Sequence, residues 1–168
     1  VAKSLVGTAE GERGDQRYRL LETVRMYASE KLAAAGEAQA LRTRHSDWYL
    51  AWLEAIPLER LTHDPDTIIA LGLEIDNLRA AADWCQVSDW PDRLACLATR
   101  MFGYWWLMGA GLEGRRWLQQ ALDAGERLAL DERIACHTTV ASISGMNLEN
   151  ALMLEHANRA ITLAAGKP

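Results

Sequence analysis

The chain of 168 residues has a formal net charge of −5 and 49% hydrophobic residues, which fits an ordinary globular domain and argues against intrinsic disorder. Alanine and leucine far outnumber valine and isoleucine, which excludes an all-β domain. The acidic excess lies after residue 60, so that part of the chain lacks the basic face that a DNA-binding module needs.

The first twenty residues predict a β-hairpin. Residues 4–6 and 17–21 have the pattern of two short strands, and Gly7, Gly11 and Gly14 lie in the polar turn between them. From residue 22 the hydrophobic period becomes helical, which predicts a first helix over about 22–35 that ends at Gly36.

The remaining sequence predicts six more helices. They cover about 38–55, 66–87, 92–108, 112–124, 131–144 and 148–165, and a loop separates the first two of them at 62–65. Because short turns between helices of this length make neighbours antiparallel, the fold class we expect is all-α, with stacked helical hairpins behind the short β-hairpin.

Internal similarity indicates that the stack is a repeat. Residues 117–122 match residues 156–161, and Gly109 matches Gly145, at offsets in the thirties that are typical of a tetratricopeptide-type array. Residues 101–122 resemble one such repeat through an aromatic pair, turn glycines and a late alanine, although Phe102 stands where the repeat has a small residue. We therefore expect a right-handed, TPR-like stack.

The residue types that carry chemistry are dispersed. The three cysteines, Cys85, Cys96 and Cys136, lie in apolar helical patterns, which predicts reduced, buried thiols. The four histidines lie in different predicted elements, and none of their spacings is that of a helical zinc site. Adjacent Cys136 and His137 point to different helix faces, so we interpret them as a buried thiol beside an exposed imidazole.

The spacing of polar residues in the sequence does not indicate catalysis or nucleotide binding. Glu74 and Asp76 cannot share a helix face, and the GxGxxG spacing of residues 109–114 follows a predicted helix and lacks the Lys-Ser/Thr of a phosphate loop. We expect no enzyme activity, no metal and no cofactor in this chain. Neither a membrane span nor a signal peptide is indicated, so a cytoplasmic fragment of a longer protein is expected.

Aromatic residues suggest a core and one binding surface. Five tryptophans lie on or beside inward stripes and are expected to pack in the core: Trp48, Trp52, Trp84, Trp105 and Trp117. The candidate partner-binding residues are Tyr104 and Trp106, expected to be half exposed, with Arg115 and Arg116 in the next helix. Aromatic and arginine side chains together suit a binding hot spot, and a solvated hairpin face remains the alternative.

Three stretches resemble a known family. Residues 17–28 are similar to the end of the winged-helix domain in bacterial signal-transduction ATPases, and residues 74–84 and 114–122 resemble the helical repeats that follow it. Together they resemble AfsR-like and LuxR-type transcriptional regulators with an NB-ARC-like ATPase core. The resemblance implies a winged-helix end over residues 1–35 and a TPR-like region over residues 36–168.

The resemblance also implies a role. It predicts a non-catalytic sensor region that binds a protein, a peptide or a small effector and controls an ATPase switch, while ATP, Mg²⁺ and DNA bind elsewhere in the parent protein. Two alternatives stay open. One is a helical scaffold without switching, and the other is direct DNA binding through Arg17, Arg19 and Arg25 of the winged-helix end.

Overall fold

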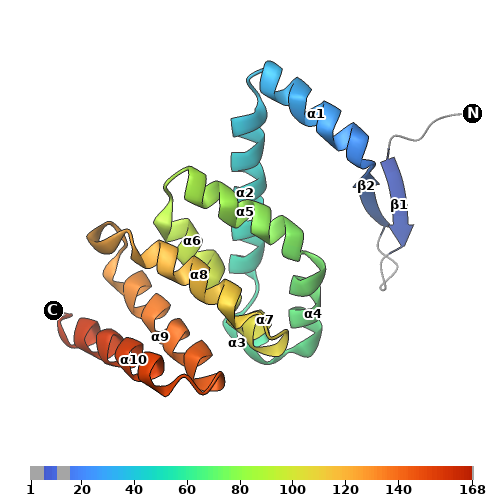
Figure 1. Ribbon diagram of the computed structural model, residues 1–168. Helices are drawn as coiled ribbons and strands as arrows, with labels where there is room; N and C mark the ends of the chain where they lie inside the picture. Colours follow the sequence, from blue (N-terminus) through green and yellow to red (C-terminus); the bar gives the residue numbers. More distant parts are fainter. Residues whose placement is uncertain (1–5, 11–15, 168) are drawn as a thin grey trace, which may run out of the picture. The chain divides into compact units, whose positions relative to one another are not determined.

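A computed structural model describes residues 6–10 and 16–167, and within them it confirms the all-α class with a small β-hairpin (Figure 1). The chain divides into two compact units, Val1–Arg42 and Thr43–Pro168, which are described separately. The division falls inside α2 (Ala38–Ala55), whose bounds match the predicted helix.

The first unit holds the hairpin and one helix. Strands β1 (Val6–Glu10) and β2 (Gln16–Leu20) pair antiparallel, with Val6 opposite Leu20. The hairpin is confirmed, but Gly7 lies in β1 rather than in the turn, and the predicted Ser4, Leu5, Gly11 and Gly14 lie outside the described residues. Helix α1 (Glu22–Ala34) ends as predicted at Gly36, whose φ of 71° favours glycine.

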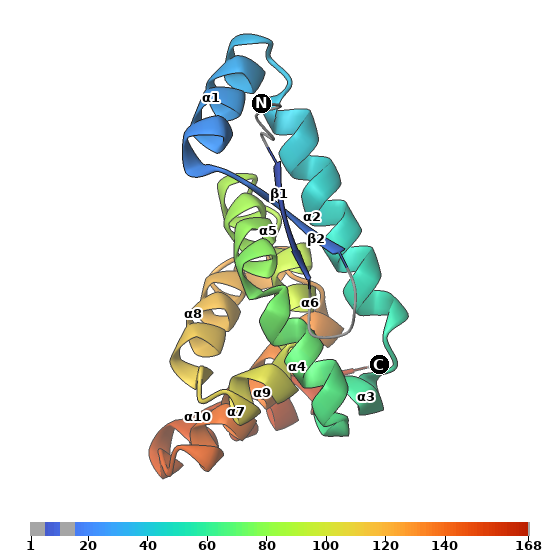
Figure 2. The ribbon, with the colours of Figure 1, turned by 90° about the vertical axis from the view of Figure 1, so that its right-hand side faces the viewer.

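The second unit is a stack of helices. After α2 it contains α3 (Leu58–His63), α4 (Pro65–Leu73), α5 (Ile75–Val87), α6 (Pro91–Arg100), α7 (Phe102–Leu107), α8 (Gly111–Leu122), a 3-10 turn (Gly125–Arg127), α9 (Leu130–Met146) and α10 (Asn150–Ala165). Helix α6 packs on α5 and α8, and α9 packs on α6 and α8. Helix α10 packs on α9 at the edge of the stack (Figure 1 and Figure 2).

Two predicted helices are broken, which corrects the sequence-based ranges. The helix expected over 66–87 breaks at Glu74, whose carboxylate accepts hydrogen bonds of 2.7 Å from the Tyr49 hydroxyl and from the Asn77 amide. The helix expected over 92–108 breaks at Met101, and α7 then packs against α3 and α4. Gly72 and Gly103 each lie two residues from a break, but inside α4 and α7 rather than at the position after a helix end.

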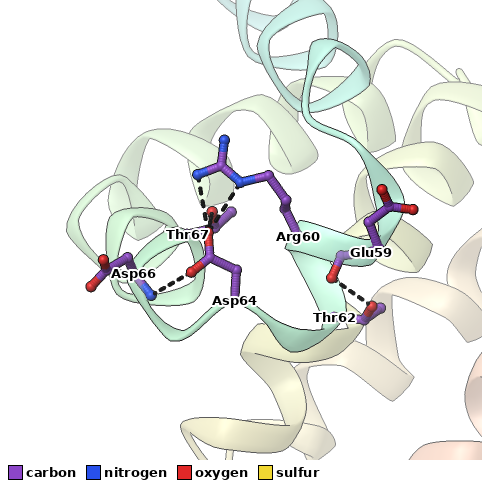
Figure 3. A network of polar contacts seen from close by, with 6 residues as sticks. All are labelled: Glu59, Arg60, Thr62, Asp64, Asp66 and Thr67. Atoms are coloured by element: carbon purple, nitrogen blue, oxygen red, sulfur yellow. Dashed lines mark hydrogen bonds and ion pairs between the residues drawn. The ribbon is translucent and has the colours of Figure 1, made fainter.

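The predicted loop at 62–65 is shorter than expected, because α3 reaches His63 and α4 begins at Pro65. Asp64 joins the two helices, as Figure 3 shows: its carboxylate accepts from the Asp66 backbone N–H at 3.3 Å, the Thr67 hydroxyl at 2.6 Å and the Arg60 guanidinium at 3.0 Å. The Thr67 and Arg60 hydrogen bonds hold the Asp64 pKa below its ordinary value. This carboxylate is therefore the N-cap of α4 and a clamp onto α3.

A second clamp secures the end of α2. The Arg100 guanidinium donates to the backbone carbonyls of Leu53, Glu54 and Ile56 at 3.0, 3.2 and 2.7 Å. Leu53 and Glu54 belong to the last turn of α2, where backbone carbonyls lack most of their partners within the helix, and Ile56 follows the helix. One side chain of α6 thereby binds three carbonyls at the end of α2.

The core of the second unit runs from α2 to α9 and contains two indole rings in edge-to-face contact. Trp105 and Trp117 are fully buried in a T-shaped pair with ring centroids 5.1 Å apart, and the Trp105 indole N–H donates to the Ala98 carbonyl at 2.9 Å. Trp52 and Trp84 are partly buried, and Trp52 packs against this core, so the core prediction holds for Trp52, Trp105 and Trp117. It is wrong for Trp48, which is 58% exposed and stacks on Trp52.

All three cysteines are free thiols, as predicted. Cys85 and Cys136 are buried, and Cys96 is partly buried. Burial raises the pKa of the Cys136 thiol to about 12 and that of the Cys96 thiol to about 11, so both are protonated at neutral pH.

Candidate interaction surface

The structure separates the four residues predicted to bind a partner. Trp106 is 52% exposed, as expected, whereas Tyr104 is only 8% exposed, so its expected half exposure is wrong. The Tyr104 ring lies against Gly72 of α4, and burial raises its pKa. The break at Met101 turns α7 so that Tyr104 faces the interior and Trp106 faces solvent.

The two arginines also differ. Arg116 is exposed, but Arg115 is partly buried and forms an ion pair with Glu149, the residue before α10. Arg115 therefore connects α8 to the last hairpin, and Trp106 and Arg116 are the members of the predicted set that face solvent.

Further apolar side chains extend the exposed area around Trp106, among them Met108 and Leu112, whose helical spacing predicts inward positions. We call this area the turn-edge surface; it consists of the exposed residues Leu73, Trp106, Leu107, Met108, Leu112 and Leu148. Its parts adjoin, because a Cβ on Gly72 would lie 3.9 Å from the Met108 methyl and a Cβ on Gly111 would lie 3.3 Å from the Asn147 amide. Figure 1 shows the α7–α8 and α9–α10 turns on the same side of the stack.

Exposed apolar residues at a turn leave a signal in the sequence only as an apolar run. Leu107 and Met108 follow Trp106 directly, and Leu112 comes after the glycine turn, so periodicity does not distinguish these residues from the core. Leu112 is 74% exposed because α8 begins one residue before it, and the neighbouring glycines take the inward positions.

The glycines at the start of α8 serve packing. A Cβ on Gly111 would lie 2.8 Å from Ile143 of α9, and a Cβ on Gly114 would lie 2.7 Å from the Trp105 ring. The same stretch follows α7, a helix, so it lacks the strand that precedes a phosphate-binding loop. Residues 109–114 thus bring α8 close to α7 and α9 and do not fit a nucleotide.

Ion pairs border the turn-edge surface. Arg79 of α5 donates to both carboxylate oxygens of Glu113 at 2.8 and 2.9 Å, which lowers the Glu113 pKa and raises that of Arg79. In this pair and in Arg115–Glu149, an arginine in the second turn of one helix reaches an acidic residue at the start of a later helix. Both pairs join residues 34 positions apart.

The histidines show one close pair that the sequence analysis did not predict. His137 of α9 and His156 of α10 are both buried, and their Nδ1 atoms lie 3.0 Å apart. The expectation of an exposed imidazole at His137 is therefore wrong. Spacing along one helix could not reveal this pair, because its members are 19 residues apart on two helices. Over residues 6–10 and 16–167, no group of three or more metal-ligating side chains gathers at one point.

The arginines considered for DNA binding lie in the first unit. Arg17 and Arg19 occupy β2, opposite Ala9 and Gly7, and Arg25 of α1 forms an ion pair with Glu22 at 2.7 Å. In the part of the chain that is described, no helix is long and apolar enough to cross a membrane.

Comparison with known proteins finds similarity to part of much larger regulators. The chain is 37% identical over 123 residues to "Putative HTH-type transcriptional regulator Rv0890c" of Mycobacterium tuberculosis and, equally, to "Putative HTH-type transcriptional regulator Mb0914c" of Mycobacterium bovis. The match covers 73% of this chain but only 14% of each relative. No family model matches the chain, and no solved structure matches it.

Proposed function

We propose that this chain is a non-catalytic regulatory part of a bacterial transcriptional regulator, and that its turn-edge surface binds a protein or peptide partner. The similarity to two proteins named as HTH-type transcriptional regulators carries the first half of this proposal. The second half rests on the cluster of exposed aromatic and aliphatic residues around Trp106, since large apolar side chains of this kind form binding hot spots.

The proposal includes a TPR-like repeat over residues 36–168. Its support is the repeated ion pair: Arg79–Glu113 joins α5 to α8, and Arg115–Glu149 joins α8 to the start of α10. Equivalent residues of the two pairs are 36 positions apart (79 to 115 and 113 to 149), close to the 34 residues of a tetratricopeptide unit. A carboxylate at the start of a helix is also favoured by the helix dipole. Repeats fixed in this way would present the turn-edge surface as one rigid patch.

The domain organisation that we propose for the parent protein follows the resemblance to AfsR-like and LuxR-type regulators. In this proposal residues 1–35 end a winged-helix domain, and the parent protein is a cytoplasmic ATPase switch that binds ATP, Mg²⁺ and DNA through its other domains. The Arg25–Glu22 ion pair favours this assignment over direct DNA contact by α1, because it neutralises one of the three arginines considered for that role.

A pair of tryptophan variants in the full-length regulator tests the binding surface. Trp106→Ala combined with Leu112→Ser should change the abundance of the regulated transcripts, because losing a hot-spot aromatic costs about 2 kcal/mol, or roughly thirtyfold in affinity. Trp48→Ala, at an equally exposed tryptophan on α2, is the matched control and should leave the transcripts unchanged. Transcript levels can be measured by RNA sequencing in the native host.

Circular dichroism first establishes that both variants keep the helical content of the parent. Unchanged transcripts in the folded Trp106/Leu112 variant would contradict the proposal. Equal changes in the Trp48 variant would also contradict it, because the effect would then not depend on the turn-edge surface.

A further inference from the structure

The last helix of the stack is attached by an unusual anchor. Helix α10 packs on α9, and His156 and Ala160 are its only buried residues. Of its large apolar side chains, Leu154 and Ile161 are exposed, and Leu152, Met153 and Leu163 are only partly buried. An imidazole therefore occupies the position in which an edge helix ordinarily carries a leucine or isoleucine.

The anchor is a hydrogen bond between two imidazoles. The Nδ1 atoms of His137 and His156 lie 3.0 Å apart, with the ring centroids 4.9 Å apart and the planes tilted by 56°. One Nδ1 must carry a hydrogen and donate it, and the other must offer its lone pair. The bond thus requires opposite tautomers in the two neutral rings.

Protons act on this bond in two steps. A first proton can bind Nε2 of the donating ring and leave the hydrogen bond in place. A second proton must take the accepting Nδ1, which removes the bond and places two cationic rings side by side. Both steps also oppose burial, which disfavours a charged imidazole.

The surrounding charges oppose protonation of His137, whereas at His156 the favourable effect of Glu155 on a cationic ring exceeds the unfavourable effect of Arg159. Arg133 of α9 and Arg159 of α10 disfavour a positive charge on His137, and only Glu155 favours one. Glu155 is itself in an ion pair with Arg159 at 2.8 Å. Among the described residues, the groups that shift the two histidine pKa values all lie on α9 and α10, and none lies on α6, α7 or α8, the other helices packed on α9.

We propose that the His137–His156 pair is a proton-sensitive latch that holds α10 on α9 at neutral pH and releases it on acidification. Release would uncover the α9 face that carries His137 and Ala141, one helical turn apart.

The direction follows from linkage. Burial lowers the His137 pKa from 6.5 to about 4 and also lowers the His156 pKa, whereas both return to ordinary values once α10 detaches. The detached state therefore binds more protons below about pH 6.5. The latch contributes its full stability above that pH and loses it progressively as the pH falls towards 4.

Hydrogen exchange of α10 measures the latch directly. After correction for the intrinsic pH dependence of exchange, the opening constant of α10 should rise by about tenfold or more between pH 7.5 and pH 5.0, whereas α5 and α6 should change little. The double variant His137→Leu/His156→Leu removes the titrating groups and should keep α10 equally protected at both pH values. His63→Gln, at an exposed histidine on α3, should behave like the parent.

Nitrogen-15 NMR of the imidazoles provides a second measurement that needs no variant. The parent protein should show opposite tautomers at His137 and His156, and both should titrate below the ordinary imidazole pKa of 6.5. Imidazoles that titrate near pH 6.5 while α10 remains protected would overturn the proposal. So would a folded double-leucine variant whose α10 opens on acidification as readily as that of the parent.

Discussion

At the scale of single residues, glycine decides how closely the short helices approach. Gly103 in α7 faces the backbone of α3, where an added Cβ would lie 2.1 Å from the Leu61 carbonyl oxygen. Gly72 in α4 offers a contrast, because its added Cβ would meet the Tyr104 ring at 3.4 Å, an ordinary contact.

Alanine at these two glycines should therefore have opposite effects. Gly103→Ala should lower the free energy of unfolding by about 1–3 kcal/mol or more, because a backbone atom cannot move away as a flexible side chain can. Gly72→Ala should be neutral or raise that free energy by up to about 1 kcal/mol, since it removes the entropic cost of glycine within a helix. Urea denaturation of both variants compares them, and equal midpoints would contradict the contact at Leu61.

Several residue predictions from sequence hold where local pattern decides the outcome. Trp105 and Trp117 are buried because both lie on apolar stripes, and Gly36 ends α1 because it can adopt a positive φ. The expected exposure of Tyr104 and of His137 is wrong for another reason. Their burial depends on a helix break and on a partner helix, neither of which leaves a periodic trace in the sequence.

At the scale of elements, short polar connections fix the helix junctions. Asp64 caps α4 and bonds Arg60 of α3 at the same time, so one carboxylate sets the angle between two helices. The sequence shows an aspartate before a proline, which predicts a helix start, but it does not show that α3 precedes it.

Removing the Asp64 carboxylate should weaken this junction. Asp64→Ala should lower the midpoint of thermal denaturation, because the first turn of α4 loses its N-cap. Asp64→Asn keeps a side-chain oxygen for the Asp66 N–H and should retain most of that stability. Thermal denaturation at neutral pH distinguishes the two, and equal losses would show that the charge on Asp64, rather than the cap, supports the junction.

Element boundaries from sequence are accurate for α1 and α2, where a glycine or a proline follows the helix end, and they fail at the breaks at Glu74 and Met101. The bounds of α2 match the prediction because Pro57 follows it, and α1 ends at Gly36. The break at Glu74 coincides with a hydrogen bond from Tyr49, 25 residues away along the chain, which helical periodicity does not reveal.

At the scale of the whole molecule, the core belongs to one unit. The buried cluster runs from Tyr49 to Ile143, and α1 contains no buried residue. The sequence indicates a switch from strands to helices near residue 22, and the resemblance predicts a domain boundary at residue 35, but neither locates the limits of the core.

A truncated chain tests the independence of the second unit. Residues 43–168 alone should retain helical circular dichroism and one cooperative thermal transition, at a midpoint close to that of the full chain, because the core cluster is complete within them. Loss of cooperativity would show that the first 42 residues contribute to folding beyond the contacts described.

The Trp105–Trp117 pair should also give the stack of helices its own circular-dichroism signal. Two strongly absorbing indoles held at 5.1 Å and 87° couple electronically, so their transitions should give a circular-dichroism couplet that isolated tryptophans lack. One ring belongs to α7 and the other to α8, the helices joined by the turn that carries Met108. A partner that moves these helices apart would abolish the couplet, which provides a label-free signal of movement at that turn.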